Sequence, residues 1–196
     1  MARPREFDRD AALKRAMSVF WAKGYAGTST DDLLEAMSIG RQSMYGAFGD
    51  KRTLYVEALE RYQQDSIMGH VDRLRSAPSP ITGIENLLLG LIAFEDDTRL
   101  LGCMGVGSIG EFGTADAELT ALRARSGAIL FKALVKQLRT AQNAGEIDTS
   151  LDAECAAKFV QTTMQGLQVA ARAGESVETL RDLALFAVER LKARRI

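Results

Sequence analysis

Five polar side chains near the N-terminus have the types and the spacing that hydrogen bonding to duplex DNA requires. Arg41, Gln42 and Ser43 follow one another, and Tyr45 and Lys51 come shortly after them. Arginine and glutamine have the bidentate geometry that fits the major-groove edges of guanine and adenine. A tyrosine hydroxyl, and a lysine beside the free N–H groups of a helix start, can bind phosphate oxygens. The alternative is that the arginine is only a solvated surface charge and the tyrosine only part of a core.

The residues around this group predict two short helices joined by a turn. Thr28 and Thr30 lie in a turn that offers hydroxyl groups as N-caps, and both could also bind phosphates. The apolar residues after them predict a helix of about two turns. A break at 38–40, which contains a glycine, separates it from a second short helix at 41–48. This is the pattern of a helix-turn-helix, whose second helix enters the major groove of DNA.

Longer helices are expected on both sides of this pair. Apolar residues spaced by three and four predict an amphipathic helix over 8–23, which Gly24 would end. Asp50 is the expected N-cap of a long helix over 51–75. Beyond it, a Ser- and Pro-rich stretch at 76–80 predicts an elbow between two units.

The rest of the chain predicts a helical body at 76–196, behind a DNA-binding head at 1–52. No stretch shows the alternating pattern of a β-strand. The expected fold class is therefore all-α, with a three-helix helix-turn-helix head and a helical body. Between the body helices, residues 102–110 are expected to form a glycine-rich, apolar segment. The expected body helices cover residues 84–94, 115–144, about 152–173 and about 177–194.

The composition is that of a soluble globular protein. The chain has 196 residues, of which 46% are hydrophobic and 26% charged, so it can bury a sizeable core. No apolar run reaches the roughly 18 residues of a membrane span, and the N-terminus lacks the apolar stretch of a secretory signal. We therefore expect a cytoplasmic protein without a membrane partner. Because the net charge is −1, DNA binding depends on local basic groups, and Arg3, Arg5 and Arg9 suggest a loose basic arm.

The stretch GYAGTSTDDLLEAMSIGRQSMYGAFGDKRTLYVEAL resembles the DNA-binding segment of the TetR/AcrR family of repressors. The shared features are the Gly-Tyr after the first helix, the Thr/Ser cap, the Tyr-x-x-Phe at 45–48 and the Lys51 that follows. The resemblance is specific over 8–60 and weaker over the helical body. It implies an Ω-shaped homodimer that binds DNA, with phosphate contacts at the positions of Thr28, Tyr45 and Lys51.

This chain departs from the family pattern directly after the tyrosine. Family members often have bulky polar residues there, whereas this chain has Gly46 and Ala47. Glycine inside a helix costs about 1 kcal/mol relative to alanine. We therefore expect the second short helix to be short or pliable.

The last two expected helices carry apolar residues on more than one face. The helix at about 152–173 has two apolar stripes, and the helix at about 177–194 adds three large apolar residues to its main stripe. One face can pack on the body, and the other needs a partner. This pattern predicts a homodimer through a symmetric four-helix interface. The alternative is packing wholly within one chain.

The body is also expected to hold a cavity for a small molecule. Such pockets are mostly apolar and have a few polar groups that orient the ligand. Seven residues are candidates for the wall because they lie in segments that resemble the sensor domain of the family, although each could instead be ordinary core. They are Phe94, Cys103, Met104, Phe112, Phe131, Met164 and Gln168.

Cys103 has two interpretations. It is either a small buried hydrophobic residue or a sensing thiol, since Arg99 lies four residues before it and some members of the resembled family detect electrophiles through a cysteine. Cys155 is interpreted as structural, and His70 has no metal-ligating partners at helical spacing. Residues 105–110 match G-x-G-x-x-G but lack the preceding strand that a dinucleotide site needs.

Together these features predict a homodimeric repressor that binds a palindromic DNA operator and is released by a small-molecule effector. The long helix at 51–75 would act as the lever between body and head. One alternative makes modification of Cys103 the trigger, and another is an enzyme or carrier on the same scaffold. We expect no catalytic residues, no cofactor and no metal site.

Overall fold

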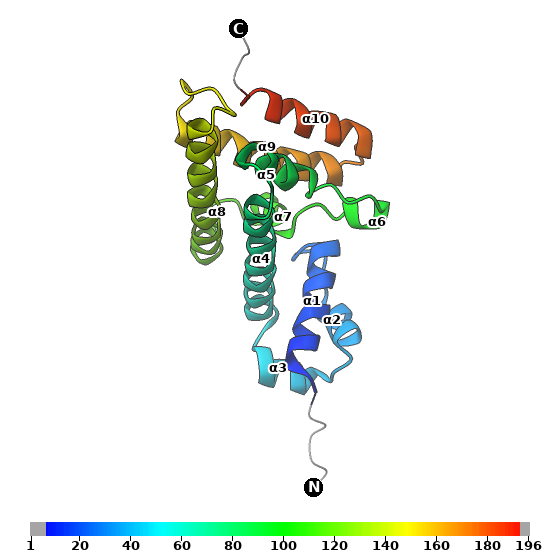
Figure 1. Cartoon of the computed structure of the whole chain (residues 1–196). Coiled ribbons are helices and arrows are strands. Elements are labelled where there is room, and N and C mark those ends of the chain that lie inside the picture. Colours follow the sequence, from blue (N-terminus) through cyan, green and yellow to red (C-terminus); the bar gives the residue numbers. More distant parts are fainter. Residues whose placement is uncertain (1–6, 193–196) are drawn as a thin grey trace.

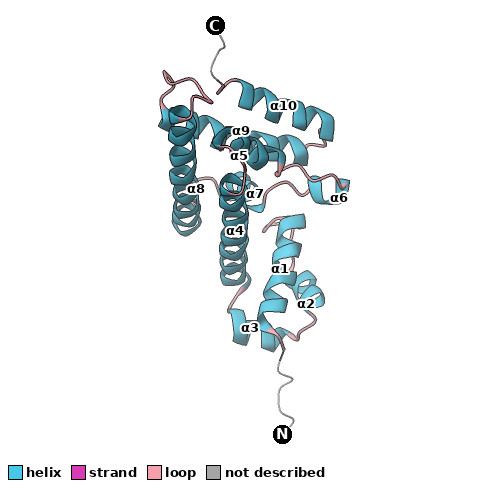
Figure 2. Ribbon diagram, viewed as in Figure 1, coloured by secondary structure: helices cyan, strands magenta, loops and turns pink. Residues whose placement is uncertain are grey.

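Helices make up almost all of the ordered fold (Figure 1 and Figure 2). The computed structural model describes residues 7–192, and in this range the only β-type contact is an isolated bridge between Ile147 and Lys192. The expected all-α class is therefore confirmed. No helix in the same range is long and apolar enough to cross a membrane. The helices are α1 (Arg9–Lys23), α2 (Thr30–Met37), α3 (Arg41–Phe48), α4 (Lys51–Arg75), α5 (Pro80–Leu89), α6 (Asp96–Arg99), α7 (Met104–Phe112), α8 (Ala117–Asn143), α9 (Ala153–Arg172) and α10 (Val177–Glu189).

Side-chain caps define where α1 and α2 of the head begin. Asp8 precedes α1 and accepts a hydrogen bond from the backbone N–H of Ala11 at 3.0 Å. Ser29 and Asp32 form a capping box at α2, in which each side chain accepts a hydrogen bond from the backbone N–H of the other residue. Gly24 ends α1 with a φ of 72°, a left-handed conformation that glycine adopts without strain.

A tight turn joins α2 to α3. Ser38 ends α2 at a φ of 56° and is the one non-glycine residue with a positive φ in the described range. Gly40 then precedes α3 and provides no side-chain cap. Leu33 and Met37 of α2 and Met44 of α3 are fully buried, so the two short helices are packed firmly onto the head.

Two hydrophobic cores share the long helix α4, which runs between the two ends of the molecule (Figure 1). The head core contains side chains of α1, α2 and α3 together with Leu54 and Leu59 from the first turns of α4. It also contains Met104 of α7 and Leu119 of α8. The body core unites α5, α8, α9 and α10 around Leu74 from the last turn of α4. Packing therefore crosses the boundary that the Ser- and Pro-rich elbow suggests.

The helix expected at 84–94 is displaced towards the N-terminus. It begins at Pro80, because the Ser79 hydroxyl accepts a hydrogen bond from the N–H of Thr82 at 3.3 Å and proline suits the first helical position. It ends before Gly90, so Phe94 lies outside the helix and 71% of it is exposed.

The segment expected to be only glycine-rich and apolar is in fact mostly helical. Residues 104–112 form α7, and the four-residue α6 before it was not expected. Helix α10 ends at Glu189, several residues earlier than the sequence pattern suggests. The other expected helices agree with α1 to α4, α8 and α9 to within a few residues.

Candidate nucleic-acid interface and ligand cavity

The first turn of α3 presents three consecutive polar residues to solvent. Arg41, Gln42 and Ser43 are all exposed, while Met44 and Phe48 on the opposite side of the helix are buried in the head core. Because Gly40 provides no capping side chain, the first backbone N–H groups of α3 also remain available. The exposed end of α3 therefore combines side-chain donors with the positive end of a helix dipole, which attracts an anion such as phosphate.

The remaining predicted DNA contacts differ in their exposure. Tyr45 is 45% exposed, so it is not part of the core, and Lys51 lies partly exposed at the start of α4 with its Nζ 4.3 Å from the ring centroid of Tyr25. Thr30 is the first residue of α2 and is partly exposed. Thr28 is turned inwards, is 1% exposed, and donates its hydroxyl hydrogen bond to the carbonyl of Gly24 at 2.6 Å.

Arg41 has a partner that DNA could replace. Its guanidinium forms an ion pair with Asp31 at 2.6 Å, and both side chains are largely exposed. Exposed ion pairs of this kind contribute little stability, about 0–1 kcal/mol. The guanidinium can therefore exchange this carboxylate for a base edge or a phosphate at small cost.

Gly46 and Ala47 do not interrupt α3. Both lie inside its regular helical span, and a methyl group at Gly46 would meet no atom within 4 Å. The carbonyl of Ala47 accepts hydrogen bonds from Arg9, which also forms a bidentate ion pair with Glu57 of α4. A cation at the C-terminal end of α3 stabilises the helix dipole. Arg9 thus fixes α3 to α4 and is not part of a loose arm, and Arg3 and Arg5 lie outside the described residues.

Helix α7 of the body is hydrogen-bonded to the turn that leads into the helix-turn-helix. The carboxylate of Glu111, near the end of α7, accepts hydrogen bonds from the backbone N–H groups of Tyr25 at 3.0 Å and Ala26 at 2.8 Å. Just before the start of α7, the carbonyl of Gly102 accepts a hydrogen bond from the indole N–H of Trp21 at 3.1 Å. Phe112, a predicted pocket residue, packs against Tyr25 here with ring centroids 5.4 Å apart.

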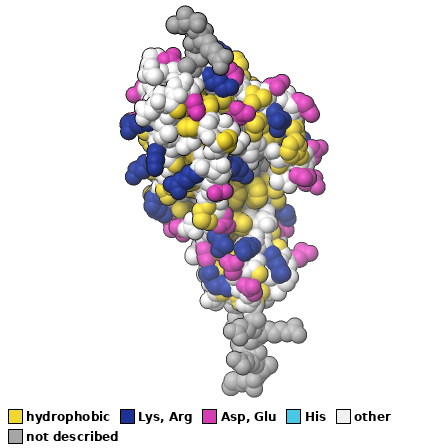
Figure 3. Space-filling view, in the orientation of Figure 1, with side chains coloured by type: hydrophobic (Ala, Val, Ile, Leu, Met, Phe, Trp, Pro, Cys, Tyr) yellow, Lys and Arg dark blue, Asp and Glu magenta, His cyan; other side chains and the backbone are white. Residues whose placement is uncertain are grey.

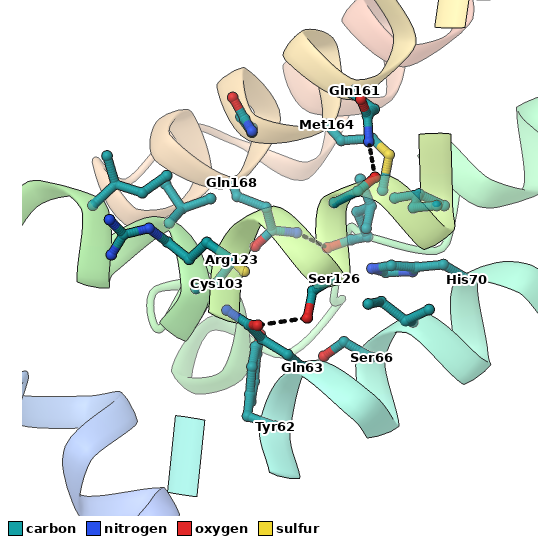
Figure 4. Close-up of a pocket in the computed structure, with 18 residues that line it drawn as sticks. Tyr62, Gln63, Ser66, His70, Cys103, Arg123, Ser126, Gln161, Met164 and Gln168 are labelled. Carbon is teal, nitrogen blue, oxygen red and sulfur yellow. Dashed lines mark hydrogen bonds between the residues drawn. The ribbon is translucent and has the colours of Figure 1, made fainter. Parts of the chain in front are cut away.

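A cavity of about 210 Å³ lies between α4, α7, α8 and α9 (Figure 4). Of the seven predicted wall residues, Cys103, Met164 and Gln168 line it. Met104 is buried in the head core, and Phe131 lies beneath Lys158, whose Nζ is 4.6 Å from the ring centroid. Together with Phe94 and Phe112, these two residues do not line this cavity.

The sequence analysis missed the contribution of α4 to the wall. Tyr62, Gln63, Ser66, Ile67 and His70 all line the cavity from this helix. Their spacing of three and four marks one face of a helix, so the signal was present. The sequence pattern predicts this helix as the lever between body and head, and it does not show that one of its faces lines a cavity.

Three amide side chains in the wall are held by hydrogen bonds to uncharged groups. The hydroxyl of Ser126 donates to the Oε1 of Gln63 at 2.7 Å (Figure 4). The Nε2 of Gln161 donates to the carbonyl of Gly127 at 2.9 Å, and the Nε2 of Gln168 donates to another backbone carbonyl. The wall is thus ordered by bonds between uncharged groups.

Burial controls the two titratable rings of the wall. It lowers the pKa of His70 to about 4, with a smaller contribution from the positive charge of Arg73. Burial also raises the pKa of Tyr62, with a further contribution from the neighbouring Cys103. Both rings are therefore neutral at physiological pH.

The structure supports neither a reactive thiol at Cys103 nor a nucleotide-binding loop at residues 105–110. Cys103 is a free thiol, and Arg99, the cation four residues before it, instead bonds the carbonyl of Phe94 and the carboxylate of Asp96. The G-x-G-x-x-G glycines lie within α7 and so do not form a phosphate-binding loop. Within the described range, no group of three His, Cys, Asp or Glu residues could hold a metal ion.

Helices α1, α2 and α3 form a head in which α3 presents its polar first turn to solvent. Such a head, carried on a helical body that contains a cavity, is typical of DNA-binding transcriptional regulators. The family model of the bacterial regulatory proteins of the tetR family matches residues 12–58. Among known proteins, the chain is 30% identical over 184 residues to the uncharacterized HTH-type transcriptional regulator YezE of Bacillus subtilis, covering 93% of this chain and 95% of that protein. The chain therefore belongs to the TetR family, as the sequence motifs indicate.

Two further relatives have more specific descriptions. The chain is 29% identical over 186 residues to the HTH-type transcriptional repressor ComR of Escherichia coli, covering 93% of this chain and 88% of ComR. It also resembles the solved structure of a cysteine mutant of the TetR-family regulator CifR in complex with 26-bp operator DNA. That similarity has a TM-score of 0.83 and 34% identity, and covers 97% of this chain and 100% of the other.

We expect the stability of the protein to fall as the pH drops from about 6.5 towards 4, because His70 resists protonation in the folded state. The unfolded chain takes up this proton near the ordinary pKa of 6.5, whereas the folded chain does so only near pH 4. Protons therefore favour unfolding in this window, by up to about 1.4 kcal/mol per pH unit. Thermal denaturation at a series of pH values measures the slope.

Since His70 is the only histidine of the chain, His70→Gln should remove most of this slope. Above pH 7 the same substitution should leave the pH dependence unchanged. Equal slopes for the variant and the parent protein between pH 6.5 and 4.5 would contradict the burial of a neutral imidazole.

Proposed function

We propose that this chain is a homodimeric repressor that binds a palindromic operator and is released when a small molecule occupies the cavity. The observation that carries this proposal is the exposed polar first turn of α3 on a firmly packed head. Support comes from the printed descriptions of ComR as a repressor and of CifR in complex with operator DNA. Such a regulator would act where the DNA is, in the cytoplasm.

In this proposal the side chains of α3 divide into two groups. Arg41, Gln42 and Ser43 contact base edges in the major groove, where arginine and glutamine recognise guanine and adenine. Tyr45, Lys51 and Thr30 bind phosphates and fix the position of the helix in the groove. Thr28 supports them indirectly, because its bonded hydroxyl holds the turn before α2.

Replacing either Tyr45 or Lys51 with alanine should weaken operator binding about tenfold, since each change removes one phosphate contact. Loss of the Lys51 cation should also reduce the salt dependence of binding by about one unit of slope. The operator is first selected from a random duplex library with the full chain, and affinity is then measured at several salt concentrations.

Lys136→Ala is the matched control, because it removes an exposed cation from α8, which lies in the body. It should leave operator affinity and salt slope unchanged. Recovery of no palindrome, or equal losses in the control and the two head variants, would overturn the assignment of α3 as the reading helix.

We also propose that α9 and α10 form the dimer interface. On α10, Leu180 and Ala184 are fully buried in the body core, while Phe186 and Leu183 on the remaining surface are 61% and 48% exposed. Phe159 of α9 is 41% exposed. Large apolar side chains left in solvent on two adjacent helices fit a symmetric four-helix interface with a second copy.

Phe186→Asp should convert the dimer to a monomer, because it would place one carboxylate from each copy in an otherwise apolar interface. Size-exclusion chromatography with light scattering measures the mass. Phe94→Asp is the control, since this phenylalanine is also largely exposed but lies outside α9 and α10. A variant at Phe186 that remains dimeric would exclude this face.

The effector would act on the head through α7. One side of this helix lines the cavity at Gly105, Val106 and Ile109, and Glu111 near its end bonds the backbone at 25–26. Movement of α7 therefore changes the support of the turn before α2. The lever helix α4 takes part as well, because it lines the same cavity and enters the head core.

Glu111→Ala should speed amide hydrogen exchange at Tyr25 and Ala26, because it removes the acceptor of both N–H groups. It should also lower operator affinity severalfold, although Glu111 bonds only the turn and not α3 itself. Glu118→Ala removes a carboxylate whose partner Arg52 keeps its ion pair with a second acid, so it serves as the control. Unchanged exchange at both amides would contradict this route.

Triggering through Cys103 is the alternative that the geometry supports less. In the described range 7–192, no hydrogen bond or ion pair joins a lysine or arginine to this thiol, and Arg99 is engaged by Asp96. Reversible binding in the cavity is therefore the mechanism that we propose.

A further inference from the structure

The wall of the cavity carries an unused hydrogen-bond donor in an uncharged setting. We propose that the cavity binds an uncharged, largely apolar small molecule whose carbonyl or hydroxyl oxygen accepts a hydrogen bond from the Nε2 of Gln63. The proposal deepens the proposed function, since the same cavity would hold the effector. It depends on that function only for the consequence of binding, not for the binding itself.

Ser126 holds the side chain of Gln63 through its Oε1, and the Nε2 donor group is left without a partner among the described residues. The residue is only 8% exposed, and its Oε1 accepts the hydrogen bond from Ser126 at 2.7 Å. This bond fixes the carboxamide so that Nε2 faces the space between α4 and α7 (Figure 4). Among residues 7–192, Nε2 donates no hydrogen bond, and it is not one of the fully buried polar atoms that lack a partner. It is therefore accessible from the cavity, and a ligand oxygen at this point would gain a hydrogen bond in a largely apolar setting.

Gly105 keeps the space in front of this donor open. A Cβ at this position would lie 3.6 Å from the Nε2 of Gln63 and 3.5 Å from the Sγ of Cys103. Any larger side chain on this turn of α7 would therefore fill the volume that a ligand needs. The glycine gives α7 a helix surface that leaves the amide accessible from the cavity.

The charge of the wall excludes cationic ligands. None of the residues that line the cavity is an aspartate, a glutamate or a lysine. His70 and Tyr62 are neutral at physiological pH for the reasons given above. An ammonium group in this cavity would lose its hydration without gaining a carboxylate, which is strongly unfavourable.

The single cation of the wall is already engaged, which disfavours anionic ligands. The guanidinium of Arg123 donates hydrogen bonds to the hydroxyl of Ser108 at 3.0 Å and to the hydroxyl of Thr120 at 3.1 Å, and also to the carbonyl of Gly113. These bonds join α7 to the start of α8. A carboxylate ligand would have to break them to reach the charge.

The size and the apolar lining of the cavity suit a small apolar ligand. The cavity volume of about 210 Å³ is below the roughly 300–1,000 Å³ of pockets for drug-sized ligands, so a ligand with one ring and one polar group has an appropriate size. Gln161, Gln165 and Gln168 lie on one face of α9 and offer further amide groups at its rim. The apolar lining consists of Ile67, Leu91, Val106, Ile109, Leu130 and Met164.

The test uses four probes that share one ring and differ in charge: benzamide, benzyl alcohol, benzoate and benzylamine. Their dissociation constants are measured at pH 7.5 by ligand-observed NMR titration of the full chain without DNA. We expect benzamide and benzyl alcohol to bind at least tenfold more tightly than the two ions. Equal or tighter binding of an ion, or no binding of either neutral probe, would overturn the proposal.

Two substitutions assign the binding to Gln63. Gln63→Met keeps the length of the side chain but removes the donor, and should weaken benzamide binding about tenfold. Gln64→Met makes the same change at the exposed neighbouring position and should have no effect. Thermal denaturation verifies that both variants fold. A Gln63→Met variant that folds and binds benzamide like the parent protein would refute the role of this amide.

The same probes separate this proposal from the proposed function. A neutral probe that binds in the Gln63-dependent manner but leaves operator affinity unchanged supports the ligand class and counts against effector release through this cavity. If the parent protein binds no operator even without a probe, this result would count against the proposed repressor function but not against the proposed ligand class.

Discussion

The 25-residue helix α4 belongs to two hydrophobic cores at once, and the other functional features depend on this arrangement. Its first turns bury Leu54 and Leu59 among the helices of the head, and its last turn buries Leu74 in the body. Close-packed interiors resist small displacements, so a shift of α4 in one core strains the other. The middle of the same helix lines the cavity, where Gln63 is buried and bonded to Ser126 and Tyr62 packs against Trp21. A ligand in the cavity would therefore contact α4 between its two cores.

The contact of α7 with the head adds a second connection of a different kind. Hydrophobic packing is non-directional, whereas the bonds from the backbone of Tyr25 and Ala26 to Glu111 require a defined geometry. These bonds stabilise the turn from which α2 and then α3 follow. Tyr25 also packs against Tyr55 and Phe112 beside these bonds, which themselves lie at the surface. The position of the turn that leads into α2 and α3 is thus set partly by residues outside the head.

The first turn of α3 and the cavity use polar groups in opposite ways. Arg41, Gln42 and Ser43 in that turn are exposed, as the proposed contact with DNA requires, and Figure 3 shows exposed Lys and Arg side chains beside Asp and Glu on the head. In the cavity the ionisable groups are either neutral, as for His70, or bonded, as for Arg123. This separation follows from burial, since charge is tolerated at a surface and costly in an interior. Under the proposed function, this separation would let one chain bind DNA and a neutral molecule at different sites.

The sequence by itself determined the helices of the head, the all-α class and the family, because caps, glycine turns and apolar spacing are local signals. Asp50 and Gly24 act where their residue types predict, whereas the N-cap of α2 is Ser29, between the two threonines expected to provide it. Only the tertiary structure decided which side chains share a cavity: Phe94 and Phe131 point elsewhere, while Gln63 and His70 of the supposed linker form the wall. It also turned Thr28 inwards and gave Arg9 a partner in Glu57. Such contacts join residues far apart in the chain, so they depend on how the helices pack, which local patterns do not specify.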